Sequence, residues 1–204
     1  MQAFLSLAMG YFMGCISPAA WVGKRHNVNL KEEGTGNLGA TNTALVLGKA
    51  AGIFVMVFDM AKSFFSYKLA KYLFPQLVIA GLLACIGVIL GHCFPIFLHF
   101  QGGKGLAAFG GMILAYSWKV FLTILIPGLI LMAILDTGVA MPMLAGVLFP
   151  IIVYRRSTSA ALALTAAAAS SIILFVHRDN LKRALEGNDV VGVRDFFRKV
   201  LPRK

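Results

Sequence analysis

The sequence predicts an all-α integral membrane protein with about seven transmembrane helices. Of its 204 residues, 59% are apolar and only 13% are charged, whereas a soluble domain is about half apolar and about a quarter charged. Apolar runs recur along the chain at near-spanning length, and a helix needs roughly 20 apolar residues to cross the hydrocarbon core. The net charge of +11 comes from Lys and Arg that gather in loops and in the C-terminal tail, which is typical of the cytoplasmic segments of membrane proteins.

Seven apolar segments give the predicted helices. They cover residues 2–23, 44–73, 76–98, 105–117, 119–136, 138–154 and 159–176. Two boundaries rest on turn formers, namely Pro75 and the run Asp136-Thr137-Gly138. The fourth segment is short, so it either tilts or crosses only in part. We expect the whole chain, 1–204, to form a single polytopic membrane domain.

The positions of the basic residues predict the orientation. The first 23 residues contain no Lys or Arg, whereas a secretory signal peptide begins with basic residues. The first positive charges, Lys24 and Arg25, follow the first apolar run, which places the N-terminus outside and the C-terminus in the cytoplasm after seven crossings.

In this topology the loops 24–43 and 99–104 share the cytoplasmic side with the basic tail 177–204. The tail is rich in Lys and Arg and agrees with the positive-inside tendency. Four residues fall on the outer side against that tendency: Lys68, Lys71, Arg155 and Arg156. The tail outnumbers them, so the predicted orientation stands.

The composition argues against nucleic-acid, disulfide and metal sites. No basic surface is interleaved with aromatic residues for stacking on bases. The three cysteines (Cys15, Cys85 and Cys93) are scattered, which is typical of packing residues. The histidines are dispersed and no carboxylate cluster accompanies them, so we expect no metal and no cofactor. The four histidines are His26, His92, His99 and His177.

The first polar segment is the run 33–42, Glu-Gly-Thr-Gly-Asn-Leu-Gly-Ala-Thr-Asn. Its glycines permit backbone N–H groups to converge on an anion. Thr41 or Asn42 could cap the next helix, whose N-terminal N–H groups attract phosphate. A flexible loop before a capped helix would contain the same residues, and this run alone does not separate the two interpretations. The residues concerned are Gly34, Thr35, Gly36, Asn37, Gly39, Thr41 and Asn42.

The second polar segment begins at Gly91-His92 and ends with Gly102-Gly103-Lys104-Gly105. The glycines permit close backbone approach, and Lys104 supplies a point charge for a phosphate. The spacing is not that of a Walker A loop. A lysine at a membrane boundary usually reaches out to water, and Lys104 alone slightly favours that interpretation. The first polar segment on the same membrane side favours a phosphate site.

The third polar segment is His177-Arg178-Asp179-Asn180, directly after the seventh apolar run. If the helix continues, His177 and Asn180 lie on one face and could hold a substrate hydroxyl or phosphate. His177 could act as a general base near neutral pH. A basic helix end at the membrane interface would look much the same.

Asp59 and Lys62 lie inside the second apolar segment. Ionisable residues at membrane depth are costly and indicate a functional site by default. The alternative is a mutual ion pair near the outer end of a long helix. Both interpretations stay open from the sequence.

Together and in this order, the three polar segments resemble the bacterial membrane glycerol-3-phosphate acyltransferases that use acyl phosphate as donor. The matching stretches are Gly34–Asn42, Gly91-His92 through Gly105, and His177–Asn180 with Gly187. The resemblance implies transfer of a fatty acyl group to the 1-position hydroxyl of glycerol 3-phosphate, giving lysophosphatidic acid. It also implies seven helices in the bacterial plasma membrane, an active site near the cytoplasmic face, and no metal.

The resemblance implies roles for these residues as well. Acyl phosphate is a mixed anhydride, so the site must mainly hold two phosphates, align the hydroxyl and stabilise developing negative charge. The catalytic residues would be His177, Asn180, Lys104 and Thr35, with His177 or a substrate phosphate oxygen as the base. Substrate binding would fall to Gly34, Gly36, Asn37, Gly39, Thr41, Asn42, His92, Gly102, Gly103, Lys104 and Gly105.

The chain departs from the family pattern at several positions. Thr35 stands where Ser is usual, and Leu45 stands where the family has an Arg that would bind phosphate in bidentate fashion. Further departures are Ser63 for Gly, Asp189 for Glu, and the altered stretch 136–142. Two alternatives therefore stay open: a diverged, non-catalytic relative, and a small transporter or binding protein for a phosphorylated metabolite. A transporter usually shows two related halves, and no repeat is visible here. The oligomeric state is not predicted.

Overall fold

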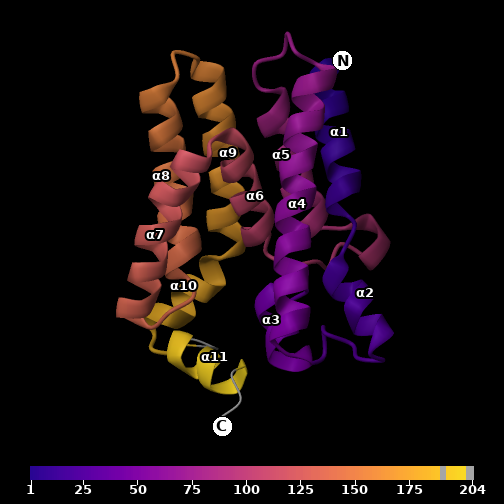
Figure 1. Cartoon of the computed structure of the whole chain (residues 1–204), viewed down its shortest axis with the longest axis vertical. Helices are drawn as coiled ribbons and strands as arrows, with labels where there is room; N and C mark the ends of the chain where they lie inside the picture. The colour runs from indigo at the N-terminus through magenta and orange to yellow at the C-terminus, as the bar shows by residue number, and fades with distance from the viewer. Residues whose placement is uncertain (189–191, 201–204) are drawn as a thin grey trace.

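The computed structural model describes residues 1–188 and 192–200, and all of its regular elements within these residues are helices. Asp189 lies outside the described residues. Figure 1 shows a helical bundle in which α5 lies beside α4 and α1, while α7, α8 and α9 form the other side. The elements are α1 (Gln2–Gly14), α2 (Pro18–Arg25), α3 (Ala40–Leu47), α4 (Lys49–Leu73), α5 (Ala80–Cys93), η1 (Ile96–Leu98), α6 (Leu106–Tyr116), α7 (Trp118–Leu135), α8 (Ala140–Arg156), α9 (Ala160–Val176), α10 (Arg178–Leu185) and α11 (Val193–Val200).

Two of the predicted apolar segments are broken helices. The segment 2–23 consists of α1 and α2, because Pro18 takes the first helical position and the Ser17 hydroxyl accepts a hydrogen bond from the Ala20 N–H at 3.2 Å. The segment 44–73 is divided at Gly48, whose φ of +89° suits glycine and breaks the helix between α3 and α4. The first of these helices, α3, already begins at Ala40. The other five segments correspond to one main helix each.

Four helical stretches in the described chain are long and apolar enough to span a bilayer by themselves. They are Gln2–Arg25, Lys49–Leu73, Ala80–Leu98 and Trp118–Leu135. A fifth is obtained if α9 and α10, which meet at a bend of 52°, form one broken span. With 11 residues, α6 measures about 17 Å, well short of the roughly 30 Å hydrocarbon core. The number of seven crossings therefore stays a prediction.

Close packing of α1 on α5 places the end of α5 inside the bundle. A Cβ atom at Gly87 or Gly91 of α5 would collide with the backbone of α1, and one at Gly10 of α1 would collide with Ala84. Such small-residue contacts bring membrane helices together. His92 follows Gly91 directly and is therefore buried at the helix–helix junction.

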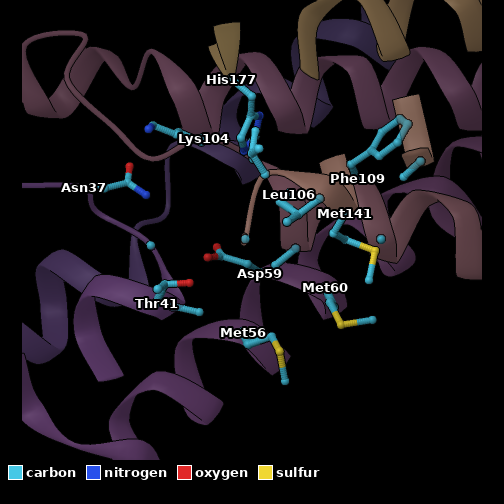
Figure 2. Close-up of a pocket in the computed structure, with 18 of the residues that line it drawn as sticks. Asn37, Thr41, Met56, Asp59, Met60, Lys104, Leu106, Phe109, Met141 and His177 are labelled. Carbon is cyan, nitrogen blue, oxygen red and sulfur yellow. The ribbon is translucent and has the colours of Figure 1, made fainter. Parts of the chain in front are cut away.

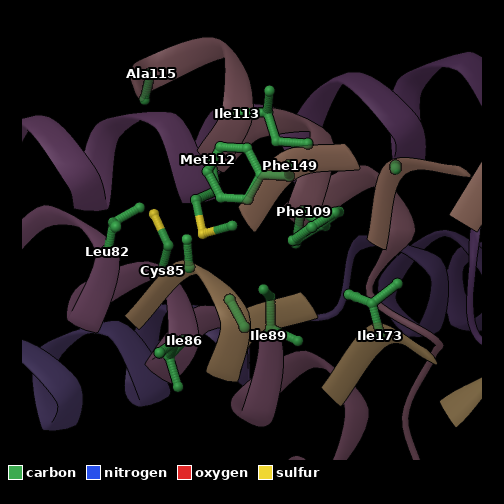
Figure 3. Packing of buried hydrophobic residues seen from close by; sticks show 14 of the residues in the cluster. Leu82, Cys85, Ile86, Ile89, Phe109, Met112, Ile113, Ala115, Phe149 and Ile173 are labelled. Carbon is green, nitrogen blue, oxygen red and sulfur yellow. The ribbon is translucent and has the colours of Figure 1, made fainter. Parts of the chain in front are cut away.

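The main apolar core lies between α5, α6, α8 and α9. Phe109 and Phe149 are fully buried and pack edge to face, with ring centroids 5.7 Å apart. Figure 3 shows these rings together with Met112 of α6 and Ile89 of α5. This core fixes α6, so that the loop before α6 is held at a defined place beside the end of α5.

Candidate functional site

A cavity of about 470 Å³ lies between α3, α4, α6, α7, α8 and the α9–α10 junction. One part of its wall is polar and the other is apolar. Figure 2 shows Asn37, Thr41 and Lys104 in the polar part and Met60, Met141 and Phe109 in the apolar part. The polar part collects residues from all three polar segments of the sequence. The predicted site residues that line the cavity are Thr35, Asn37, Gly39, Thr41, His92, Lys104, Gly105, His177 and Asn180.

The side chain of Asn42 holds the loop before α3 in place through hydrogen bonds to the backbone of that loop. The Asn42 Nδ2 group donates to the carbonyl oxygens of Leu30 at 2.8 Å and Glu33 at 3.1 Å, and its Oδ1 accepts from the Thr35 N–H at 2.6 Å. Asn42 is fully buried and does not line the cavity. The prediction that Thr41 or Asn42 caps α3 is wrong, because Gly39 is the N-cap and no side chain caps the helix.

The glycines of this loop serve its fold more than an anion nest. The Gly36 N–H donates to the Glu33 carbonyl at 3.0 Å, and the Gly39 N–H donates to the Asn37 carbonyl at 2.9 Å. Gly34 and Gly36 adopt positive φ angles of 61° and 70° and lie outside the cavity wall. The N-terminal end of α3 faces the cavity instead, through Ala40 and Thr41. First-turn N–H groups have no partner within their helix and favour anions.

The loop before α6 packs on the end of α5 in the same manner. The Gly102 and Gly103 N–H groups donate to the carbonyl oxygens of Cys93 and His92, each at 3.0 Å. A side chain at Gly103 would collide with the His92 ring and the Leu38 carbonyl. These two glycines are therefore needed for close packing and do not line the cavity. Their packing brings Lys104 to the cavity wall.

Asn180 lies between two cations. Its Oδ1 atom accepts hydrogen bonds from Lys104 Nζ and from Arg183 Nη2, the latter at 2.8 Å. Arg183 also lines the cavity, and its Nε atom is buried without a hydrogen-bond partner among residues 1–188 and 192–200. Two cations on one amide oxygen repel each other, and an anion between them would relieve the repulsion. A phosphate could accept from both.

Sequence analysis missed Arg183, which it treated only as part of the basic tail. The signal was present, because Arg183 lies three residues after Asn180, on one face of α10. Guanidinium groups suit phosphate because they offer paired donors in a fixed plane. Arg183 thus provides in this chain a guanidinium at the cavity, whereas position 45 carries Leu.

His177 sits one residue beyond α9 and is buried. Its Nδ1 atom lies 2.9 Å from the Ile173 carbonyl oxygen, which can only accept, so Nδ1 carries the proton and donates. Burial lowers the pKa of the His177 imidazole to about 4, and the nearby positive charge of Lys104 acts in the same direction. The ring is therefore neutral at physiological pH, with Nε2 able to accept a hydrogen bond from a substrate hydroxyl.

Asp59 and Lys62 form a buried ion pair at 2.8 Å between Oδ1 and Nζ. The pair has a third member, because His92 Nδ1 lies 3.3 Å from the same carboxylate oxygen. Lys62 also donates to the carbonyl oxygens of Gly14 and Ile16 at the break after α1, each at 3.0 Å. Asp59 and His92 line the cavity. The two residues thus form an ion pair, as one interpretation predicted, but the pair lies midway along α4 and at the cavity wall rather than near an end of the helix.

The apolar part of the cavity was not predicted from the sequence. It is lined by aliphatic, aromatic and thioether side chains of α4, α6, α7 and α8. Met56 of α4 and Leu129 of α7 are 41% and 52% exposed, so this part approaches the lipid-facing surface. Other lining residues are Met60, Leu106, Phe121, Ile124, Leu125 and Met141. Within the described residues, no three His, Cys, Asp or Glu side chains cluster as metal ligands.

These features define the class of protein as an all-helical membrane protein with a cavity whose wall is cationic in one part and apolar in the other. The comparison with protein families agrees with this class. A family model described as glycerol-3-phosphate acyltransferase matches residues 4–187, and the chain belongs to this family.

Curated relatives carry the same description. A glycerol-3-phosphate acyltransferase of Macrococcus caseolyticus is 44% identical over 128 residues, which are 61% of this chain and 63% of that protein. The match to the Exiguobacterium sibiricum relative spans 58% of its length. Longer matches extend to Geobacillus kaustophilus, 36% identical over 89% of this chain and 91% of the relative.

Two solved structures have the same fold. Both are of PlsY (YgiH), an integral membrane glycerol 3-phosphate acyltransferase. Its glycerol 3-phosphate form superposes with a TM-score of 0.85 at 27% identity and covers 93% of this chain and 94% of that chain. The lysophosphatidic acid form gives 0.85 at 26% identity, over 97% and 99% of the two chains. The shared fold, together with the apolar helices, identifies this chain as an integral membrane protein.

Proposed function

We propose that the protein transfers a fatty acyl group from acyl phosphate to glycerol 3-phosphate and releases lysophosphatidic acid and phosphate. The observation that carries this proposal is a cavity in which Lys104 and Arg183 meet a lipid-like apolar wall. An acyl phosphate has the same two parts, a phosphate and a long apolar chain. Family membership and the likeness to PlsY support the identity of both substrates.

The reaction needs no covalent enzyme intermediate. The glycerol 3-phosphate hydroxyl oxygen attacks the acyl carbonyl carbon, an ester C–O bond forms, and the C–O bond to the phosphate breaks. The hydroxyl proton passes to His177 Nε2 or to an oxygen of the departing phosphate. Lys104 and Arg183 would hold phosphate oxygens and reduce the repulsion between the two anionic substrates. The N-terminal ends of α3 and α6 add partial positive charge.

Alignment is the main contribution of the polar wall. Asn180 fixes the directions of Lys104 and Arg183, and the Ile173 carbonyl fixes the His177 ring. Fixed groups need no reorganisation as charge develops, and correct alignment of two reactants lowers the barrier by several kcal/mol or more. Thr35, Asn37 and Thr41 offer further donors to the substrates at the same wall.

For the topology we propose seven crossings, with the N-terminus outside and the cavity's polar part at the cytoplasmic face of the bacterial plasma membrane. The basic helix α10 adjoins this part of the cavity, which supports a cytoplasmic location. Cysteines introduced at Asn37 and Lys182 should both react with a membrane-impermeant maleimide only from the cytoplasmic side. The native cysteines are buried and give a low background. Labelling from opposite sides would refute this topology.

The activity is tested with purified protein, palmitoyl phosphate and labelled glycerol 3-phosphate. We expect labelled lysophosphatidic acid, with one phosphate released for each product molecule. A well-folded protein that binds both substrates and forms no product would instead be a non-catalytic relative. Movement of glycerol 3-phosphate across vesicles without acylation would identify a transporter.

A further inference from the structure

The end of the molecule opposite α10 and α11 carries a second cavity, of about 480 Å³. It lies where the C-terminal part of α4 approaches the α6–α7 and α8–α9 connections. Figure 1 shows the α8–α9 and α4–α5 connections at the end of the bundle opposite α10 and α11. Its polar lining consists of Tyr67, Lys71, Tyr116, Ser117 and Arg156. None of these residues belongs to the polar segments from which the function was inferred.

The charge at this end is positive without compensation in the local sequence. Five basic residues lie in or next to the helix ends here: Lys68, Lys71, Lys119, Arg155 and Arg156. The stretches 60–135 and 137–178 contain no Asp or Glu. In the proposed topology this end is the outer face, where the positive-inside tendency disfavours such a cluster, so an anionic ligand at this place would account for it.

The backbone adds a third positive feature. Ser117 is the N-cap of α7, and its hydroxyl accepts from the Val120 N–H at 3.5 Å. Because Ser117 lines the second cavity, the N-terminal end of the 18-residue helix α7 faces the same space as Lys71 and Arg156. Helix N-termini and paired cations are the groups that bind phosphate in proteins.

The surroundings of the second cavity match the headgroup level of a bilayer. Tyr72, Trp118 and Tyr154 lie at the ends of α4, α7 and α8 and are 81%, 60% and 70% exposed. Exposed Tyr and Trp rings mark membrane–water interfaces. Apolar residues also line the cavity, among them Leu77, Val78 and Leu162. A ligand here would place an anionic group beside the cations and its chains along the apolar surface.

We propose that the second cavity binds the phosphate group of an anionic phospholipid, held by Lys71, Arg156 and the N-terminus of α7. The site is separate from the catalytic cavity and does not depend on the acyltransferase activity. A bound anionic phospholipid explains why this end of the protein keeps basic residues, which the positive-inside tendency disfavours on the outer side of the proposed topology. Tyr67 and Tyr116 can add hydroxyl donors to the phosphate oxygens.

The test uses two matched pairs of substitutions in the full-length protein. The pair Lys71→Gln/Arg156→Gln removes two charges that line the second cavity. The pair Lys68→Gln/Arg155→Gln removes the same charge from the same helices, three and one residues away, outside the lining. Phosphatidylglycerol and phosphatidylcholine are titrated into each purified protein, and the bound lipid is counted by native mass spectrometry.

The wild-type protein should bind phosphatidylglycerol more tightly than phosphatidylcholine. Lys71→Gln/Arg156→Gln should weaken phosphatidylglycerol binding by roughly tenfold or more, since each basic residue contributes about 1 kcal/mol to binding an anionic lipid surface. Lys68→Gln/Arg155→Gln should weaken it less than about twofold. If the first pair fails to fold, the single variants Arg156→Gln and Arg155→Gln are compared instead.

Three results would overturn the proposal. Equal weakening by both pairs would mean a general charge effect without a site. Equal affinity of the wild-type protein for the two lipids would mean no recognition of the anionic group. Displacement of phosphatidylglycerol by inorganic phosphate at equal concentration would mean a site for a small anion rather than for a lipid.

Discussion

The polar and apolar parts of the candidate site, the cavity beside α3 and the α9–α10 junction, are built in different ways. In the polar part, most side chains have a named hydrogen-bond partner, and Lys104 is brought there by Gly102 and Gly103, which pack on α5 where any side chain would collide with a neighbour. In the apolar part, the wall consists of flexible thioethers and large aliphatic groups, partly exposed toward lipid. Methionine adapts its shape to irregular ligands. The comparison leads us to expect that the proposed reaction needs closely fixed groups at the phosphates and only a loose fit around the acyl chain.

The largest expected effect concerns the buried charges that support the polar part. Lys62→Met leaves Asp59 buried without its ion-pair partner and removes two hydrogen bonds to the end of α1. Removing one member of a buried pair costs about 3–5 kcal/mol, so the thermal unfolding midpoint should fall steeply. Lys68→Met, at an exposed position on the same helix, is the control. Equal midpoints for the two variants would contradict the supporting role.

Lys104→Ala should have the largest effect on activity without loss of the fold. It removes a cation that faces the reacting phosphates, and loss of one such group lowers kcat by about 100- to 1000-fold. Steady-state acylation of glycerol 3-phosphate measures the effect. Lys182→Ala on the exposed face of α10 serves as the control. Full activity of the Lys104→Ala variant would show that Lys104 has no role in the reaction.

Arg183→Gln tests the residue that the sequence motifs did not reveal. A hydrogen bond to a charged group contributes about 1.5–3 kcal/mol, so kcat/KM should fall by roughly 10- to 100-fold. The loss should fall mainly on the KM for one of the two phosphate-bearing substrates, and Arg183→Lys should restore part of it. Arg178→Gln, which changes a cation stacked on Phe175, is the matched control. If both Gln variants lose activity equally, Arg183 has no special role.

Gly110→Leu should alter chain-length preference and leave the chemistry intact. A Cβ atom at Gly110 would have only ordinary contacts, 3.7 Å from Phe121 and 3.9 Å from Met60, so a longer side chain extends into the apolar part. Gly110 lies about 8 Å along the helix from Gly105, so long chains should be excluded first.

The measured quantity is the ratio of kcat/KM for palmitoyl phosphate to that for octanoyl phosphate, which should fall about tenfold. Met60→Ala on the facing wall should restore part of the ratio in the double variant. Thr123→Leu places a leucine at an exposed position of α7 outside the cavity wall and should change nothing. An unchanged ratio in Gly110→Leu would place the acyl chain elsewhere.

Much of the fold followed from apolar runs, since five of the seven predicted segments correspond to one main helix each. The breaks at Ser17-Pro18 and Gly48 escaped prediction, because apolar residues continue on both sides of each break. The seven-segment pattern and the family resemblance led to the right family. The family description and the fold of PlsY agree with it.

Individual site residues were predicted less completely. The spacing of residues along the chain shows which of them can lie near one another, but it does not show where each side chain points. Lys104, His177 and Asn180 do meet at one cavity, whereas Asn42 turns into its own loop and Gly102 and Gly103 pack on α5. Arg183 looked like any other basic residue of the tail until its neighbours were known. The apolar wall is formed by residues of four separate helices, α4, α6, α7 and α8. No local sequence motif therefore indicates it.

In the proposed function, one molecule of acyl phosphate lies along the cavity, with its phosphate at Lys104 and its chain between α4 and α7. A non-hydrolysable palmitoyl phosphonate carrying a photoreactive group at mid-chain tests it most directly, by mass spectrometry of the crosslinked peptides. We predict crosslinks to Met60, Gly110 or Phe121, all suppressed by excess palmitoyl phosphate. Suppressible crosslinks confined to α1, α2 or α9 would contradict the account.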